Sequence, residues 1–100
     1  MRLTDAELKG IIEAFHDHFS KEEQLWLFGS RVDDKQKGGD IDLYIQSQTN
    51  DSEKLFQAKI NFLVALTTKI GDQKVDVVVS IPPHSLPIHQ HAKETGIRLV

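Results

Sequence analysis

Apolar residues recur at helical spacing in two parts of the chain. The first set consists of Leu8, Ile11, Ile12, Phe15 and Phe19. This spacing predicts an amphipathic helix that ends at about Phe19. Thr4 and Glu7 stand in the order of a capping box, so Thr4 is the expected N-cap. The second set consists of Leu55, Phe56, Ile60, Phe62, Leu63, Leu66 and Ile70. It predicts a longer helix that begins after capping residues at 50–53 and ends at Gly71.

Short apolar runs predict the strands. Residues 24–28 are apolar and aromatic, and residues 40–46 and 74–80 are rich in β-branched and apolar side chains. The polar segment 31–39, which ends in two glycines, is expected to be a mobile loop with a helical turn after Ser30.

The last part of the chain predicts one more helix and one more strand. Pro82 and Pro83 are expected to end the third strand, and Ser85 or Pro87 to begin a short helix that Gly96 closes. Residues 97–100 then form a terminal strand.

The order of elements is helix, strand, turn, strand, helix, strand, helix, strand. Such an order predicts an α+β fold with α/β character, in which helices pack on a small mixed sheet. The chain has 100 residues and shows neither internal repeats nor a linker. We therefore expect a single domain over residues 1–100.

Composition narrows the classes of function. The chain is 39% hydrophobic and 27% charged, which is typical of soluble domains, and it has no apolar run long enough to span a bilayer. It has no cysteine and no apolar signal region near its N-terminus, so we expect a cytoplasmic protein without disulfides or thiolate zinc sites. The net charge of −3 argues against binding a nucleic-acid backbone without help.

The histidines do not indicate a metal site. His16 and His18, like His89 and His91, are two residues apart, a spacing that puts them on different faces of a helix.

The strongest chemical signal is a pair of aspartates at the start of the second predicted strand. Asp40 and Asp42 flank Ile41, and alternate residues of a strand point to the same face. Two neighbouring carboxylates repel each other and are stabilised by a cation. Mg²⁺ is the natural choice, because it binds one or two carboxylates together with substrate phosphates.

A third carboxylate lies in the third predicted strand. Asp76 interrupts an otherwise apolar β-branched run, where aspartate is disfavoured. If this strand lies beside Asp40 and Asp42, the three carboxylates can hold two metal ions, and Asp76 can accept the proton of an incoming hydroxyl. Each aspartate by itself is compatible with a solvated strand edge, and only the combination indicates a site.

The residues before the aspartates fit a phosphate-binding turn. Gly29 allows a sharp turn after a strand, and Ser30 offers a hydroxyl and a backbone N–H. Arg31 and Lys37 are candidates for neutralising phosphate charge. The segment does not match a Walker A loop.

These residues together resemble a known family. The segment from Leu27 through Gly29, Ser30 and Arg31 to Asp40 and Asp42, with Asp76 downstream, resembles the DNA polymerase beta-like nucleotidyltransferases. The short chain looks most like the minimal nucleotidyltransferases of prokaryotes, or MNT proteins. One departure is Gly39, where many members carry serine.

The resemblance implies an activity and a set of roles. Gly29 and Ser30 would bind nucleotide phosphates, next to Arg31 as the candidate cation, and Asp40, Asp42 and Asp76 would be catalytic and hold two Mg²⁺ ions. The reaction would move a nucleoside monophosphate, usually AMP from ATP, to a hydroxyl. MNT proteins are commonly paired with a small helical HEPN protein as a toxin–antitoxin system, so the resemblance implies a protein acceptor.

Other interpretations stay open from the sequence. The chain could neutralise a partner by occlusion without catalysis, or it could modify a small molecule such as an antibiotic as a homodimer. A purely structural role explains three strand aspartates poorly. Both a homo-oligomer and a hetero-oligomer are compatible with the sequence.

Overall fold

The computed structural model describes residues 1–35, 39–49, 51–81 and 86–100. The helices are α1 (Asp5–His18), α2 (Ser52–Ile70) and α3 (Pro87–Thr95), with a 3-10 turn η1 (Gly29–Val32). The strands are β1 (Gln24–Phe28), β2 (Ile41–Gln46), β3 (Val75–Ser80) and β4 (Ile97–Arg98). The α+β fold predicted from the sequence is confirmed.

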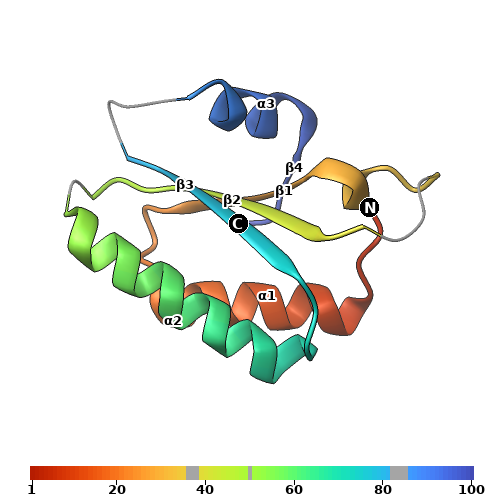
Figure 1. Ribbon diagram of the computed structural model, residues 1–100, viewed down its shortest axis with the longest axis horizontal. Coiled ribbons are helices and arrows are strands. Elements are labelled where there is room, and N and C mark those ends of the chain that lie inside the picture. The colour runs from red at the N-terminus through yellow and green to blue at the C-terminus, as the bar shows by residue number, and fades with distance from the viewer. Residues whose placement is uncertain (36–38, 50, 82–85) are drawn as a thin grey trace.

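The four strands of the described residues form one mixed sheet in the order β3-β2-β1-β4. β1 is antiparallel to both β2 and β4, whereas β3 is parallel to β2. The parallel pair is joined by α2, as a crossover between parallel strands requires. Helices α1 and α2 cover one face of the sheet, and α3 lies on the other face (Figure 1).

Capping explains where the long helices begin. The Thr4 hydroxyl accepts a hydrogen bond from the Glu7 backbone N–H at 3.0 Å, and the Glu7 carboxylate accepts one from the Thr4 N–H at 2.9 Å. Helix α2 begins after Asp51, whose carboxylate accepts from the Lys54 N–H at 3.2 Å. These side chains satisfy backbone donors that the first turn of a helix leaves free.

Element ends differ from the sequence prediction by one or two residues. Helix α1 ends at His18, β2 begins at Ile41 rather than residue 40, and β3 begins at Val75. The terminal strand covers residues 97–98, although the Leu99 N–H still donates to the Leu25 carbonyl at 2.8 Å. The predicted ends at Pro82, Pro83 and Ser85 lie outside the described residues.

The main core lies between the sheet and the helices α1 and α2. Three phenylalanine rings form its centre: Phe15 and Phe19 stack with centroids 5.1 Å apart, and Phe62 meets both edge-on. Leu25, Leu27, Ile41, Leu43 and Ile45 supply the sheet side of this core. No helix in the described part of the chain is both long and apolar enough to cross a membrane.

We expect Phe62→Ala to lower the free energy of unfolding by about 3–5 kcal/mol, because Phe62 is fully buried and its removal leaves a cavity. Urea denaturation measures this change. Phe56 lies on the same helix with 64% of its surface exposed, so Phe56→Ala is the matched control and should change stability by less than about 0.5 kcal/mol. Equal losses for the two variants would contradict this placement of the core.

Candidate active site

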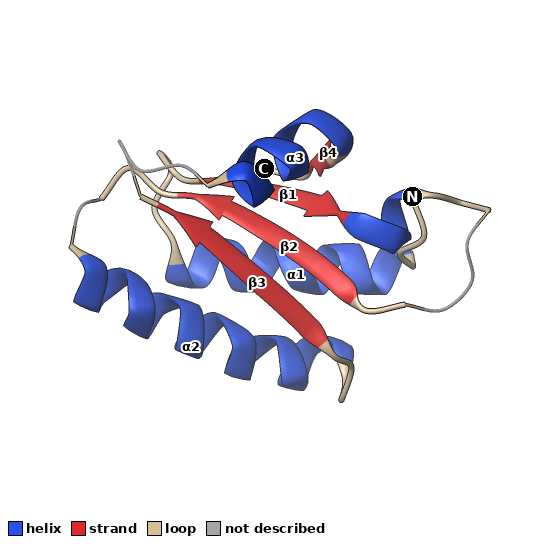
Figure 2. Ribbon diagram, turned by 45° about the horizontal axis from the view of Figure 1, so that its top comes forward, coloured by secondary structure: helices blue, strands red, loops and turns tan. Residues whose placement is uncertain are grey.

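Three strand ends meet at one end of the sheet. β1 ends where β2 and β3 begin, and η1 follows directly from β1 (Figure 2). In the antiparallel pair Phe28 lies opposite Asp42, and in the parallel pair Asp42 lies opposite Asp76. The sheet register therefore brings two of the predicted site residues side by side, although 33 intervening residues separate them in the chain.

Strand alternation turns both carboxylates away from the main core. Ile41 and Leu43, on either side of Asp42, are fully buried against α1 and α2. Tyr44, two residues after Asp42, packs on the opposite face with Trp26 and Phe28. Asp42 consequently faces the α3 side of the sheet, where it is partly buried, while Asp76 on the same side is exposed.

Asp40 lies just before β2 and is engaged by a lysine. The Lys74 ammonium is 3.2 Å from an Asp40 carboxylate oxygen, and the two side chains are 72% and 42% exposed. The hydrogen bond and charge of Asp40, followed by the charge of Asp76, raise the pKa of Lys74. Lys74 thus supplies positive charge beside the carboxylates.

Sequence reasoning missed Lys74 as a member of the site. Lys74 immediately precedes β3, and its carbonyl accepts from the Ile41 N–H at 3.2 Å, which ties it to the start of β2. Lys74 stands two positions before Asp76, and a cation so close to an aspartate within an apolar strand is a sequence signal that could have identified Lys74 as part of the site.

The electrostatics of Asp42 reflect this crowding. Burial is the main cause that raises the pKa of the Asp42 carboxyl above its ordinary value, and the charges of Asp76 and Asp40 raise it further. Lys74 opposes the shift. The ionised form of Asp42 is therefore destabilised by its surroundings, and a bound cation would lower the free energy of that form.

The carboxylates suit a magnesium ion only in part. Among the residues that the structure describes, no three acidic or histidine side chains are grouped closely enough to hold a metal ion. Mg²⁺, however, commonly binds one or two carboxylates and completes its shell with water and substrate phosphates. The adjacent pair Asp42 and Asp76 fits that smaller requirement, with Asp40 at the same end of the sheet.

The turn after β1 lies directly against Asp42. Gly29 has a φ of 77°, and a Cβ at this position would collide with the Asp42 carboxylate. Gly39 has a φ of 88°, and a Cβ there would collide with the Ser30 hydroxyl. Glycine at 39 therefore makes room for the Ser30 hydroxyl.

Arg31 connects the turn to the segments around it. Its Nε donates to the Gly39 carbonyl at 3.2 Å, and its Nη1 donates to the Arg2 carbonyl at 3.0 Å. The predicted phosphate-binding role of Arg31 is not tested by these contacts, but they show that its guanidinium also supports the turn. Lys37, the second predicted phosphate contact, lies outside the described residues.

Helix α3 closes the remainder of the carboxylate face. His89 stacks on Tyr44 with centroids 5.5 Å apart, and its Nδ1 accepts from the Leu86 N–H at 2.9 Å. Burial lowers the pKa of His89, which favours the neutral ring that this contact needs. The Tyr44 and Ser80 hydroxyls share a buried hydrogen bond of 2.7 Å. At the end of this face beside η1, among the described residues, Asp76 is exposed and Asp42 is partly buried.

The raised pKa of Asp42 predicts a pH-dependent effect on stability. Ionisation of Asp42 opposes folding, so the penalty is absent below the unfolded-state pKa and grows as pH rises through the folded-state pKa. We expect Asp42→Asn to increase the free energy of unfolding at about pH 7, with the gain shrinking toward zero near pH 4. Denaturant unfolding across this range measures it.

The control for this prediction is Asp72→Asn, which changes an exposed carboxyl in the turn before β3. Its effect should vary less with pH. A pH-independent effect of Asp42→Asn would contradict the crowding inferred for Asp42.

The close approach of Gly29 to Asp42 predicts a second effect on stability. Gly29→Ala and Gly71→Ala both introduce a side chain at positive φ, which costs about 1–3 kcal/mol. At Gly71 the new Cβ meets nothing within 4 Å, whereas at Gly29 it meets Asp42. We expect Gly29→Ala to be the more destabilising variant in thermal and urea unfolding. Equal losses would show that the turn does not press on Asp42.

Comparison with known proteins adds one finding to this geometry. A family model described as polymerase beta, nucleotidyltransferase matches residues 9–100. No curated protein matches the chain. The matched segment includes the Gly29–Ser30 turn and the aspartates at 40, 42 and 76. The chain therefore belongs to the polymerase beta nucleotidyltransferase family and is a transferase domain whose family chemistry is nucleotidyl transfer.

Proposed function

We propose that this chain is a magnesium-dependent nucleotidyltransferase that moves a nucleoside monophosphate, AMP from ATP, to a hydroxyl of a partner protein. The observation that carries the proposal is the parallel register that sets Asp42 beside Asp76, directly against the Gly29 turn. Family membership supports nucleotidyl transfer in general. The partner protein, the adenine nucleotide and the metal are parts of the proposal.

In the proposed reaction, the turn binds the phosphates and the aspartates bind the metal and the proton. Gly29 and Ser30 would bind the phosphates through backbone N–H groups and the serine hydroxyl. Asp40, Asp42 and Asp76 would hold Mg²⁺ together with the phosphates, and Asp76 would also accept the proton of the acceptor hydroxyl. Bound Mg²⁺ supplies charge neutralisation for the phosphates. The hydroxyl oxygen forms a bond to the α-phosphorus, the bond from that phosphorus to the bridging oxygen breaks, and pyrophosphate leaves.

A protein acceptor is favoured because the carboxylates occupy an open surface at the end of the sheet. Helix α3 covers the other end of the same face through Tyr44 and His89. A second macromolecule can supply the missing wall and the hydroxyl together. By its resemblance to MNT proteins, we propose a small helical HEPN-type protein as this partner, with the present chain as its antitoxin.

The test is a transfer assay read by intact mass. The purified chain is mixed with the product of the neighbouring gene, Mg²⁺ and ATP. We expect the partner to gain the mass of one nucleoside monophosphate, and we expect EDTA to prevent the gain. Asp42→Asn should abolish the adduct because it removes a metal ligand while preserving side-chain shape.

Thermal unfolding of Asp42→Asn checks that the variant is folded, and Asp72→Asn serves as the active control. An adduct formed by Asp42→Asn would contradict the assigned site. Association of the two proteins without any adduct would favour neutralisation by occlusion and would reject catalysis.

A further inference from the structure

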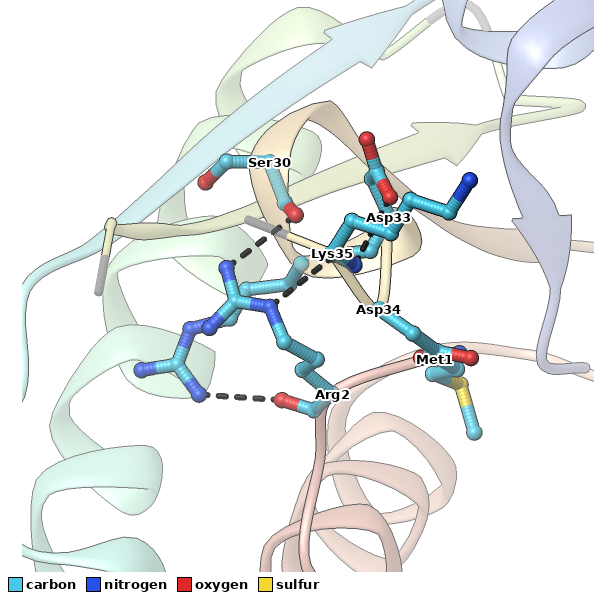
Figure 3. Close-up of polar contacts among 7 residues, drawn as sticks. Met1, Arg2, Ser30, Asp33, Asp34 and Lys35 are labelled. Carbon is cyan, nitrogen blue, oxygen red and sulfur yellow. Dashed lines mark hydrogen bonds and ion pairs between the residues drawn. The ribbon is translucent and has the colours of Figure 1, made fainter. Parts of the chain in front are cut away.

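The segment before α1 lies over the turn η1 (Figure 3). The Arg2 backbone N–H donates to the Arg31 carbonyl at 2.6 Å. Its side chain reaches the same turn, with Nη2 donating to the Ser30 carbonyl at 3.1 Å and Nε donating to the Asp33 carbonyl at 3.0 Å. One residue therefore binds three successive parts of the segment that follows β1.

The hydrogen bonds from Arg2 stabilise η1. A single 3-10 turn has poor internal hydrogen bonding, and its last carbonyls have no partner within the turn. Within η1 the Asp33 N–H donates to the Ser30 carbonyl at 3.2 Å. The planar guanidinium of Arg2 offers donors in a fixed fork, which suits two carbonyls that converge on one side. The charged donors make these bonds stronger than neutral ones.

The contacts form a closed loop of two arginines. Arg2 binds the carbonyls of the turn, and Arg31 in the turn donates back to the Arg2 carbonyl at 3.0 Å and to the Gly39 carbonyl at 3.2 Å. Gly39 directly precedes Asp40. The network thus links the N-terminal segment, the turn that carries Ser30, and the start of the carboxylate segment.

The hydrogen bonds from Arg2 lie at the opposite end of η1 from the proposed phosphate-binding end. In a helical turn the carbonyls point toward its C-terminal end and the N–H groups toward its N-terminal end. Arg2 occupies the carbonyl side, whereas the Gly29 end adjoins Asp42. Arg2 can therefore orient the turn without touching a phosphate bound at that end.

We propose that Arg2 is a positioning residue that holds the Gly29–Ser30 turn in the conformation that binds the nucleotide phosphates. The identity of this ligand rests on the proposed function. The guanidinium of Arg2 donates to carbonyls of the turn segment, so its loss affects the nucleotide and leaves a divalent cation bound alone unaffected.

The test uses Arg2→Gln, which removes the charge and the fork. Isothermal titration calorimetry measures the dissociation constants of MgATP and, separately, of Mn²⁺ without nucleotide, well below the unfolding temperature. We expect the MgATP constant to rise about tenfold, a change of about 1.4 kcal/mol, and the Mn²⁺ constant to stay within twofold. Arg2→Lys keeps the charge but not the fork, and should give an intermediate MgATP affinity.

The matched control is Arg98→Gln, which removes an exposed arginine of β4 whose guanidinium lies over the Trp26 ring of β1. It should leave both constants unchanged. Equal MgATP affinity in wild type and Arg2→Gln overturns the positioning role while leaving the proposed function intact, as does a parallel loss of Mn²⁺ affinity. Absence of MgATP binding to the wild type rejects the proposed function and this proposal together.

Discussion

The repulsion between Asp42 and Asp76 is the constraint on which the rest of the site depends. Burial is the largest cause that disfavours the ionised state of Asp42, and the charge of Asp76, at the same level of the adjacent strand, adds to the effect. Such a pair persists only where other interactions specify the register. Here the register of β2 is fixed by the opposite face of the strand, because a shift of the pairing by one residue would move Ile41 and Leu43 out of the core.

Each strand of the sheet consequently serves two purposes at once. In β2, for example, the odd-numbered residues bury apolar side chains against α1 and α2, and the even-numbered residues face α3. Along that second face the environment changes over a short distance, from the open carboxylates at one end to the buried Tyr44 and Ser80 hydroxyls at the other. Helix α3 therefore covers the part of this face that carries Tyr44, and Asp76 stays exposed at the end of the sheet beside η1.

The turn is held from both sides. On one side Gly29 lets the backbone approach Asp42 more closely than any side chain would allow. On the other side Arg2 binds the carbonyls of Ser30 and Asp33. A four-residue 3-10 turn has little stability of its own, so its geometry is a property of these surrounding contacts. Lys74, which is also distant from Asp40 in the sequence, belongs to the electrostatic environment of the carboxylates.

The sequence by itself determined the elements and the chemistry. Helical spacing, capping residues and apolar runs predicted the order of helices and strands correctly, because these signals are local. The aspartates and the Gly29–Ser30 turn indicated nucleotidyl transfer through their residue types and spacing, and the family match agrees.

Only the tertiary structure decided which residues share the site. Strand order and register put Asp76 beside Asp42, brought Lys74 to Asp40 and folded Arg2 over the turn. None of these pairings leaves a periodic signal, because each depends on a contact between segments that are distant in the chain. The sequence also did not reveal that Asp40, Asp42 and Asp76 fall short of a three-ligand cluster, since that depends on how side chains of neighbouring strands are oriented.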